Sequence, residues 1–205
     1  MGRAVKITKE MMLEAAYDIL LESGYNAVNI KSIASKVGCS TQPVSWHFGN
    51  MKDMRKELFS YALERMNTIR LSFKPSGNAI LDYFEIGKNN ISLACEYPNL
   101  YKFIFIEGPG DFEGPFAKTN NLFDIVGDPG TAKILSEQYG LNYEKTLDTL
   151  RSIEIYTHGL ASLMIWDNFR LSTEKAFEMI FNEGKNKLEL LGINIENDWI
   201  EHCSK

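Results

Sequence analysis

Two short helical patterns flank a single glycine in the stretch 30–48, IKSIASKVGCSTQPVSWHF, and this arrangement limits the folds open to the chain. The first helix is predicted by apolar side chains at the spacing of one helix face, namely Ile30, Ile33, Ala34 and Val37. Gly38 can adopt the left-handed conformation that ends a helix and turns the chain sharply. The stretch therefore predicts a helix, a tight turn and a second helix.

The caps of the two helices can be read from the same stretch. Asn29 is placed to cap the first helix, and Ser40 precedes a second helix that begins at Thr41. Pro43 fits the first turn, because its missing N–H would have had no partner within the helix. Since Pro43 cannot donate, we expect Ser40 to accept the N–H of Gln42.

The second helix has an apolar inner face and a polar outer face. Val44 and Phe48, four residues apart, can pack against the first helix. The outer face then carries Thr41, Gln42, Ser45 and Trp46. Their hydroxyl, amide and aromatic groups suit base edges, phosphates and thymine methyl groups. This combination favours a helix-turn-helix DNA-binding unit over an ordinary helical hairpin inside a larger bundle.

Helical patterns on both sides complete a three-helix unit. Upstream, Thr8 caps a helix that ends at Gly24 and has the apolar stripe Met12, Leu13, Ala16, Ile19 and Leu20. Downstream, Asn50 and Asp53 form a capping-box-like pair at the start of a longer helix.

The order and spacing of these signals resemble the DNA-binding domain of the TetR family of one-component transcriptional repressors. The resemblance rests on residues 33–40, Ile-Ala-Ser-Lys-Val-Gly-Cys-Ser, and on residues 46–48, Trp-His-Phe, at the end of the second helix. A looser likeness at residues 157–163 extends it over most of the chain. It implies a homodimer that binds an operator and releases it when a small molecule enters the C-terminal domain.

The resemblance also implies which residues meet DNA. The family usually has Tyr at the position of Ser45 and Lys at that of Met51, so phosphate contacts here would come from His47, Lys52 and the amides that begin the fourth helix. The residues expected at the DNA interface are Lys31, Thr41, Gln42, Pro43, Ser45, Trp46, His47 and Lys52.

The charge distribution is consistent with DNA contact through the N-terminal part. The whole chain has a net charge of −5, but residues 1–57 hold eight Lys or Arg against six Asp or Glu. The remainder holds fourteen against twenty-one. This small positive balance predicts few phosphate contacts per subunit.

The cysteine spacing and the lack of a long apolar run indicate which compartment and which cofactors to expect. The three cysteines, Cys39, Cys95 and Cys203, are far apart and suggest neither a disulfide framework nor a zinc site. No apolar run approaches the roughly 18 residues of a membrane span. We therefore expect a cytoplasmic protein with no metal, no cofactor and no membrane partner.

The C-terminal part reads as helices and contains many aromatic residues. Residues 101–106 alternate like a strand, but a single strand has nothing to pair with, so a short helix from Pro98 is preferred. Residues 107–115 are expected to form a loop. A pocket for a small apolar or aromatic effector is expected to involve Tyr83, Tyr101, Phe103, Phe105, Phe112, His158 and Trp166.

Two long helices, capped by Asn142 and Ser172, close the chain with apolar stripes too broad for one neighbour. They predict a four-helix bundle with the same helices of a second subunit. The residues expected at this dimer interface are Ile153, Thr157, Leu160, Ala161, Met164, Phe177, Ile180, Phe181, Gly184 and Leu188.

The sequence thus predicts an all-α protein. A homeodomain-like helix-turn-helix domain occupies residues 1–50, a connecting helix 51–74, a ligand-binding and dimerisation domain 75–192 and a tail 193–205. The expected function is that of a ligand-responsive repressor that binds a palindromic operator as a homodimer. Two alternatives stay open: a helical protein-binding adaptor, and an all-α enzyme using Glu154 and His158, which lie four residues apart.

Overall fold

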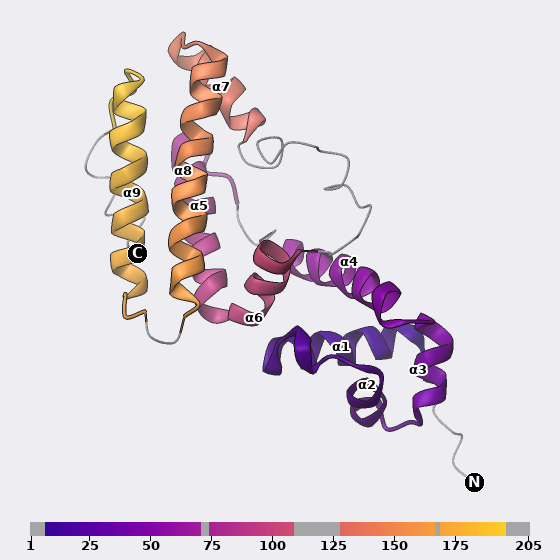
Figure 1. Ribbon diagram of the computed structural model, residues 1–205. Helices are drawn as coiled ribbons and strands as arrows, with labels where there is room; N and C mark the ends of the chain where they lie inside the picture. Colours follow the sequence, from indigo (N-terminus) through magenta and orange to yellow (C-terminus); the bar gives the residue numbers. More distant parts are fainter. Residues whose placement is uncertain (1–6, 71–73, 109–127, 167–168, 196–205) are drawn as a thin grey trace. The chain divides into compact units, whose positions relative to one another are not determined.

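The computed structural model describes residues 7–70, 74–108, 128–166 and 169–195. Within these ranges every regular element is helical, which confirms the predicted all-α class (Figure 1). The chain divides into two compact units. Unit 1 contains residues 1–72 and 97–112, and unit 2 contains residues 73–96 and 113–205.

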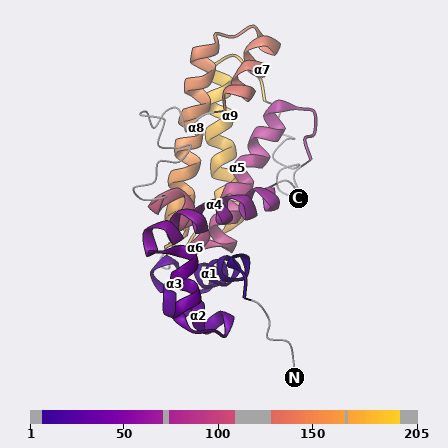
Figure 2. The same cartoon turned by 90° about the vertical axis from the view of Figure 1, so that its right-hand side faces the viewer.

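Unit 1 begins with three helices and a fourth, longer one. They are α1 (Lys9–Ser23), α2 (Ile30–Val37), α3 (Thr41–Phe48) and α4 (Met51–Arg70), with a 3₁₀ turn, η1 (Tyr25–Ala27), between α1 and α2. Two short elements from later in the chain join them: α6 (Pro98–Tyr101) and the π-helical η2 (Lys102–Glu107). Figure 2 shows the short α2 and α3 close to α1.

The predicted caps account for most boundaries in unit 1. The Asn29 side chain accepts the N–H groups of Lys31 and Ser32 at 3.0 Å each, and the Ser32 hydroxyl accepts the N–H of Asn29 at 3.0 Å. Gly38 ends α2 in the left-handed region, with φ 75°. Asn50 likewise accepts the N–H of Asp53 at 2.9 Å. These reciprocal bonds satisfy donors that a helix start leaves unpaired.

One predicted cap is wrong. Ser40 precedes α3, but its side chain makes no cap hydrogen bond. Elsewhere in the chain Thr8, Asn142 and Ser172 each accept the third N–H of the helix they begin. In α3 the third residue is Pro43, which has no N–H to offer.

The core of unit 1 joins α1, α2, α3 and α4. Its most completely covered side chains are Met12, Ala16, Leu20, Ile33, Val44, Met54 and Leu58. Those on α1, α2 and α3 come from the apolar positions that the sequence analysis names. The three-helix arrangement is therefore held by residues at helical spacing on adjacent elements.

Residues 97–108 pack in unit 1, although the sequence-based division assigned them to the domain 75–192. The Asn99 amide donates to the Leu21 carbonyl at 2.9 Å. The Phe103 ring stacks on Tyr25 with centroids 5.0 Å apart and meets Phe59 edge-on at 5.7 Å. Aromatic burial against α1 and α4 thus draws this segment into unit 1.

Arg55 of α4 makes several contacts that hold residues 97–108 in unit 1. Its guanidinium lies 4.1 Å from the ring centroid of Tyr25 and 5.1 Å from that of Phe103. One terminal nitrogen donates to the Gly108 carbonyl at 2.8 Å and lies 3.7 Å from the Glu107 carboxylate. The Arg55 Nε is buried with no hydrogen-bond partner. The cation is therefore held mainly by two aromatic faces and the end of η2.

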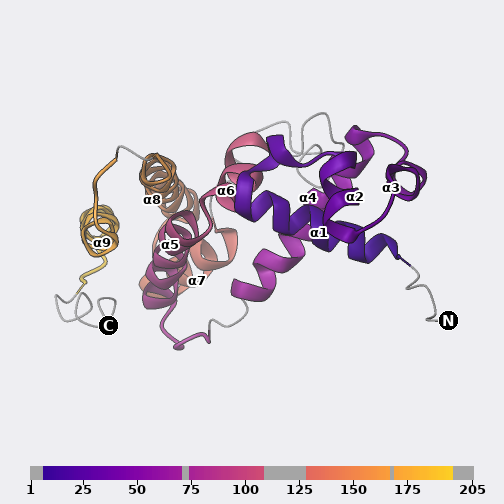
Figure 3. The same ribbon diagram turned by 90° about the horizontal axis from the view of Figure 1, so that it is seen from below.

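Unit 2 consists of α5 (Ala79–Glu96), α7 (Pro129–Tyr139), α8 (Tyr143–Met164) and α9 (Thr173–Leu190). The helices α5, α8 and α9 run side by side in Figure 1, and α8 and α9 are seen nearly end-on in Figure 3. The sequence analysis did not predict α7. Its signals were nevertheless present, because Asp128 caps it and Pro129 occupies its first turn.

Close contacts of α5 with α8 and α9 build the core of unit 2. The buried Tyr83 hydroxyl donates to the Leu150 carbonyl at 2.9 Å, and burial raises the pKa of this phenol. The rings of Phe84 and Phe181 lie 4.9 Å apart. A Cβ at Gly184 would lie 2.4 Å from Phe84 Cε1, so only glycine lets α9 approach α5 this closely.

Many residues predicted for the dimer interface, and two predicted for the tail, lie in the core of unit 2. Eight of the ten expected interface residues, all except Met164 and Phe177, are buried within the subunit. These residues pack against α5 and against each other in the core of unit 2, and a role in the dimer stays a prediction. Ile193 and Ile195, assigned to the tail, are also core residues. Residues 109–115 of the expected loop lie outside the described residues.

Candidate nucleic-acid interface

The outer face of α3 is exposed as its spacing predicts. Val44 and Phe48 are 0% and 4% exposed, whereas Trp46 between them is 79% exposed. The exposed residues of this helix, which we call the α3 face, are Thr41, Gln42, Ser45 and Trp46. A ring left so open on a packed helix is not required by the core of unit 1.

The chemistry of the α3 face is polar but uncharged. Its members supply two hydroxyl groups, one carboxamide and one indole. The Trp46 and His47 rings meet edge to face with centroids 4.7 Å apart. Pro43 and His47 are half-buried at the margins of the face. No residue of α3 is Lys, Arg, Asp or Glu.

The cations near α3 in sequence lie on α2 and α4. Lys31 and Lys52 are exposed in the first turns of these helices. Lys36 instead binds Glu22 at 2.8 Å and lies 3.7 Å from Asp18, and the hydrogen bond to Glu22 raises its pKa. Lys31 has no acidic partner among the described residues. The eight residues expected at the DNA interface therefore lie on three consecutive helices of unit 1.

The seven expected effector residues are divided between the two units. In unit 1, Tyr101 and Phe103 are 1% exposed, and Tyr101 lies against the half-buried Phe105 at 4.8 Å between centroids. In unit 2, Tyr83 is a core residue, whereas His158 and Trp166 are exposed. Phe112 lies outside the described residues.

Glu154 and His158 lie one turn apart on α8. Partial desolvation lowers the pKa of His158, although its side chain is exposed. No group of three or more His, Cys, Asp or Glu side chains in the described residues is placed to hold a metal ion. The arrangement therefore offers one acid and one base on a single turn of helix, with no metal-holding cluster beside them in the described residues.

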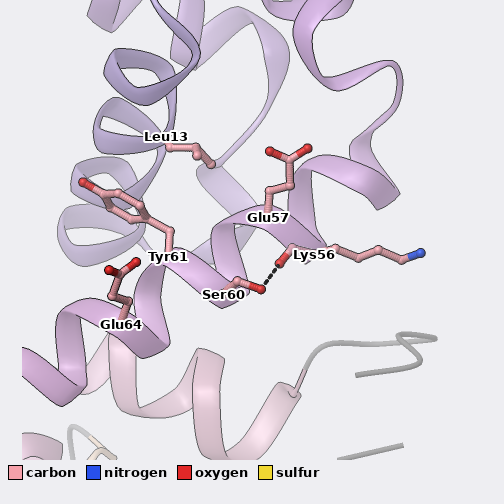
Figure 4. A pocket seen from close by; sticks show the side chains of 6 residues that line it. All are labelled: Leu13, Lys56, Glu57, Ser60, Tyr61 and Glu64. Atoms are coloured by element: carbon pink, nitrogen blue, oxygen red, sulfur yellow. Dashed lines mark hydrogen bonds between the residues drawn. The ribbon is translucent and has the colours of Figure 1, made fainter. Parts of the chain in front are cut away.

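An open groove of about 400 Å³ lies between α1 and α4 in unit 1 (Figure 4). It is lined by Leu13, Lys56, Glu57, Ser60, Tyr61 and Glu64. Glu57 is paired with Lys9 at 2.6 Å, and the Tyr61 hydroxyl accepts a hydrogen bond from Arg65 at 2.6 Å. None of the residues predicted to bind DNA or effector lines this groove.

Sequence reasoning missed a second exposed surface, on α8. Ile155, Gly159, Leu163 and Trp166 follow one another at intervals of four, four and three residues. The three large side chains are 50%, 42% and 66% exposed, and a Cβ at Gly159 would meet nothing within 4 Å. We call this surface the α8 stripe. Its helical spacing was visible in the sequence, but the sequence analysis assigned the interface to the stripe beside it, at Ile153, Thr157, Leu160, Ala161 and Met164.

Comparisons with known proteins identify the N-terminal part. Residues 12–58, which contain α2, α3 and most of α1, match the model of the bacterial regulatory proteins of the tetR family. No curated protein sequence matches the chain significantly. Among the described residues, no helix is long and apolar enough to cross a membrane.

Solved structures resemble the chain over most of its length. A TetR-like transcriptional regulator from Rhodococcus sp. RHA1 has a TM-score of 0.62 at 12% identity, covering 92% of this chain and 98% of that chain. A second transcriptional regulator from the same organism has a TM-score of 0.61 at 14% identity, with 92% and 100% covered.

A third similar structure is a substituted TetR from Acinetobacter baumannii AYE in complex with minocycline. Its TM-score is 0.53 at 16% identity, with 91% of this chain and 96% of that chain covered. These likenesses agree with the observed fold, and the family match covers the helix-turn-helix itself. Residues 12–58 are therefore a DNA-binding domain of the tetR family of bacterial regulatory proteins, and the chain is a DNA-binding transcriptional regulator.

Proposed function

We propose that this regulator is a repressor that binds a palindromic operator as a homodimer in the cytoplasm and is released by a small apolar or aromatic effector. The observation that carries the proposal is the α3 face, which is open to solvent while the opposite side of the same helix is fully buried. The outer side of a short helix after a tight turn is the part of a helix-turn-helix that enters the major groove.

Contacts to the DNA backbone are proposed for four residues around this face. Lys31 and Lys52 supply positive charge, and Pro43 and His47 flank the groups that reach the bases. Because only a few cations are present, each subunit alone would bind weakly. A steep gain in affinity then requires two subunits on one duplex.

The α8 stripe is the surface proposed to join two copies of the chain. It is apolar, it is unused within unit 2, and Gly159 leaves room for the backbone of a second helix. The half-buried Met164 and Phe177 are the two residues of the original interface that can still contribute. The outward positions of α9 carry Lys175, Glu178, Asn182 and Asn186, which favours α8 as the centre of the contact.

Two subunits matter because of the geometry of B-DNA. Recognition helices about 34 to 36 Å apart reach successive major grooves on one side of the duplex. An effector that changes this separation would weaken binding, and such coupling is typically about 1 to 3 kcal/mol. Release of DNA by an effector would therefore follow from a change in the distance between the two recognition helices.

The segment 97–108 is proposed to carry the effector signal. Its contacts with Tyr25, Arg55 and Phe59 hold it in unit 1, and it follows directly on Glu96, the last residue of α5 in unit 2. A ligand that alters α5 would therefore act on a segment packed against α4. Minocycline, which the similar Acinetobacter protein binds, is a suitable aromatic probe.

The test is binding to the DNA upstream of the chain's own gene, measured with the full-length protein at several salt concentrations. The proposal expects this duplex to bind at least tenfold more tightly than a random duplex of equal length, with a negative slope of log K against log salt. Equal and weak binding of both duplexes at every salt concentration would contradict the proposal.

Effector release is tested on the same complex with a panel of planar aromatic compounds that includes minocycline. An active compound should lower operator affinity at a saturable concentration. A compound that binds the protein and leaves operator affinity unchanged would argue against release by that chemical class.

A further inference from the structure

The α3 face has a chemistry that restricts which base pairs it can recognise. Guanine is most often read in the major groove by Arg or Lys, which donate two hydrogen bonds to its O6 and N7 atoms. The helix α3 contains no Arg or Lys at any of its eight positions. The commonest means of reading a G·C pair is therefore absent from the recognition helix.

The groups that are present match A·T pairs. A Gln carboxamide can accept from adenine N6 and donate to N7 in the same plane, and a methyl or ring surface can contact the thymine C5-methyl group. Gln42 and Thr41 are the first two residues of α3, and both are exposed. In helix-turn-helix proteins the N-terminal residues of this helix contact the base edges.

The neighbouring groups leave Gln42 available for this contact. Among the described residues, its carboxamide has no hydrogen-bond partner, and Val44 holds the opposite side of the helix in the core at 0% exposure. Trp46 presents its indole one turn further along at 79% exposure. A planar hydrogen-bonding group and a large apolar surface thus lie on the same side of α3.

We propose that each half of the operator contains a run of A·T pairs, in which Gln42 pairs with one adenine and Trp46, with Thr41, contacts thymine methyl groups. This inference rests on the proposed function, since it specifies what the DNA-binding surface recognises. It assigns base specificity to Gln42 and Trp46 and leaves the phosphate contacts to Lys31, Lys52 and His47.

The first experiment selects duplexes from a random pool with the full-length chain. The proposal expects consecutive A·T pairs in each half of the enriched site. Replacing the critical adenine by 7-deazaadenine, which lacks N7, should lower affinity about tenfold, because one of the two bonds to Gln42 is lost. Replacing thymine by uracil, which lacks the methyl group, should lower the affinity of the unaltered protein and have a smaller effect on Trp46→Ala.

A change of specificity provides the sharper test. Gln42→Glu removes the amide donor and leaves acceptors, which suit the N4 donor of cytosine, so one position per half-site should change from A to C. Gln42→Ala should lose preference at the same position. Gln138→Glu makes the same chemical change at an exposed position of α7 and should leave the selected site unaltered.

Two other results are decisive. Enrichment of a specific site whose half-sites consist of G·C pairs, or an adenine preference that persists in both Gln42 variants, would overturn this inference and leave the proposed DNA-binding function standing. If no sequence is enriched and all duplexes bind equally weakly, both the inferred base specificity and the proposed repressor function are contradicted. Because Gln42 is exposed, unchanged melting temperatures of the variants will show that they fold.

Discussion

Among the residues that the structure describes, two tryptophans are exposed to solvent, and their surroundings differ in polarity. Trp46 on α3 is 79% exposed beside Gln42 and Ser45, whereas Trp166 at the end of α8 is 66% exposed beyond Ile155 and Leu163. The first has polar, uncharged neighbours, and the second ends an apolar stripe. An exposed aromatic ring alone therefore does not identify its partner.

The two surroundings suit two different binding partners, the major groove of DNA and a second protein subunit. A major groove presents hydrogen-bonding base edges together with methyl groups, so an indole among hydroxyl and amide groups suits it. A second protein subunit presents apolar side chains, so an indole among aliphatic groups suits that partner instead. The two tryptophans thus separate the proposed DNA contact from the proposed subunit contact.

The strongest way to break this comparison is to place a charge in the α8 stripe. Leu163→Asp would bury an unpaired carboxylate between two subunits, so we expect a monomer in light scattering and a loss of palindrome affinity of about 100-fold or more. Asn182→Asp, at an exposed position of α9, should have no such effect. A variant that remains dimeric would remove the α8 stripe from the interface.

A matched pair of glycines separates core from interface. In Gly184→Ala the new methyl meets the Phe84 ring, and we expect a loss of about 1 to 3 kcal/mol in the free energy of unfolding. In Gly159→Ala the methyl meets open space, so the isolated subunit should gain up to about 1 kcal/mol from helix propensity while dimerisation weakens. Denaturant unfolding at two protein concentrations measures both. Equal destabilisation by both substitutions would show that Gly159 is also a packing position.

Removing each indole sharpens the comparison directly. Trp46→Ala should weaken operator binding about tenfold without moving the melting temperature much, because the ring contributes little to the core. Trp166→Ala should weaken dimerisation and leave binding to a single half-site unchanged. A large loss of thermal stability in Trp46→Ala would instead make this ring a packing residue.

The smallest expected effect concerns one phosphate contact. Lys52→Ala should weaken binding to all sequences alike and reduce the slope of log K against log salt by about one per subunit. Lys133→Ala, at an exposed position of α7, is the matched control. An unaltered slope would remove Lys52 from the DNA interface.

Local signals made unit 1 the more predictable part of the molecule. Asn29, Gly38 and Asn50 act through bonds within a few residues, so the sequence contains both partners. The same reasoning failed at Ser40, where Pro43 removes the donor that a cap would need. Helix boundaries therefore followed from local chemistry.

The partners of apolar stripes were less predictable, because helical spacing shows that a face is buried without showing what buries it. Leu160 and Ile180 were assigned to a second subunit, yet the subunit's own core covers them. Phe103 was assigned to the C-terminal domain, yet it packs on Tyr25 and Phe59. Both differences concern contacts between residues distant in sequence, which helical periodicity does not encode.

The packing of residues 97–108 in unit 1 determines how this protein can be dissected. A fragment that stops at residue 72 would retain the whole helix-turn-helix. It would lack the Phe103 ring that packs against Phe59 and the Gly108 carbonyl that accepts a hydrogen bond from Arg55. Because aromatic side chains buried in the full chain would be exposed in this fragment, we expect the fragment to aggregate. The DNA-binding unit is therefore not an independent N-terminal module, because the segment that completes its packing lies more than twenty residues downstream, after the first helix of the other unit.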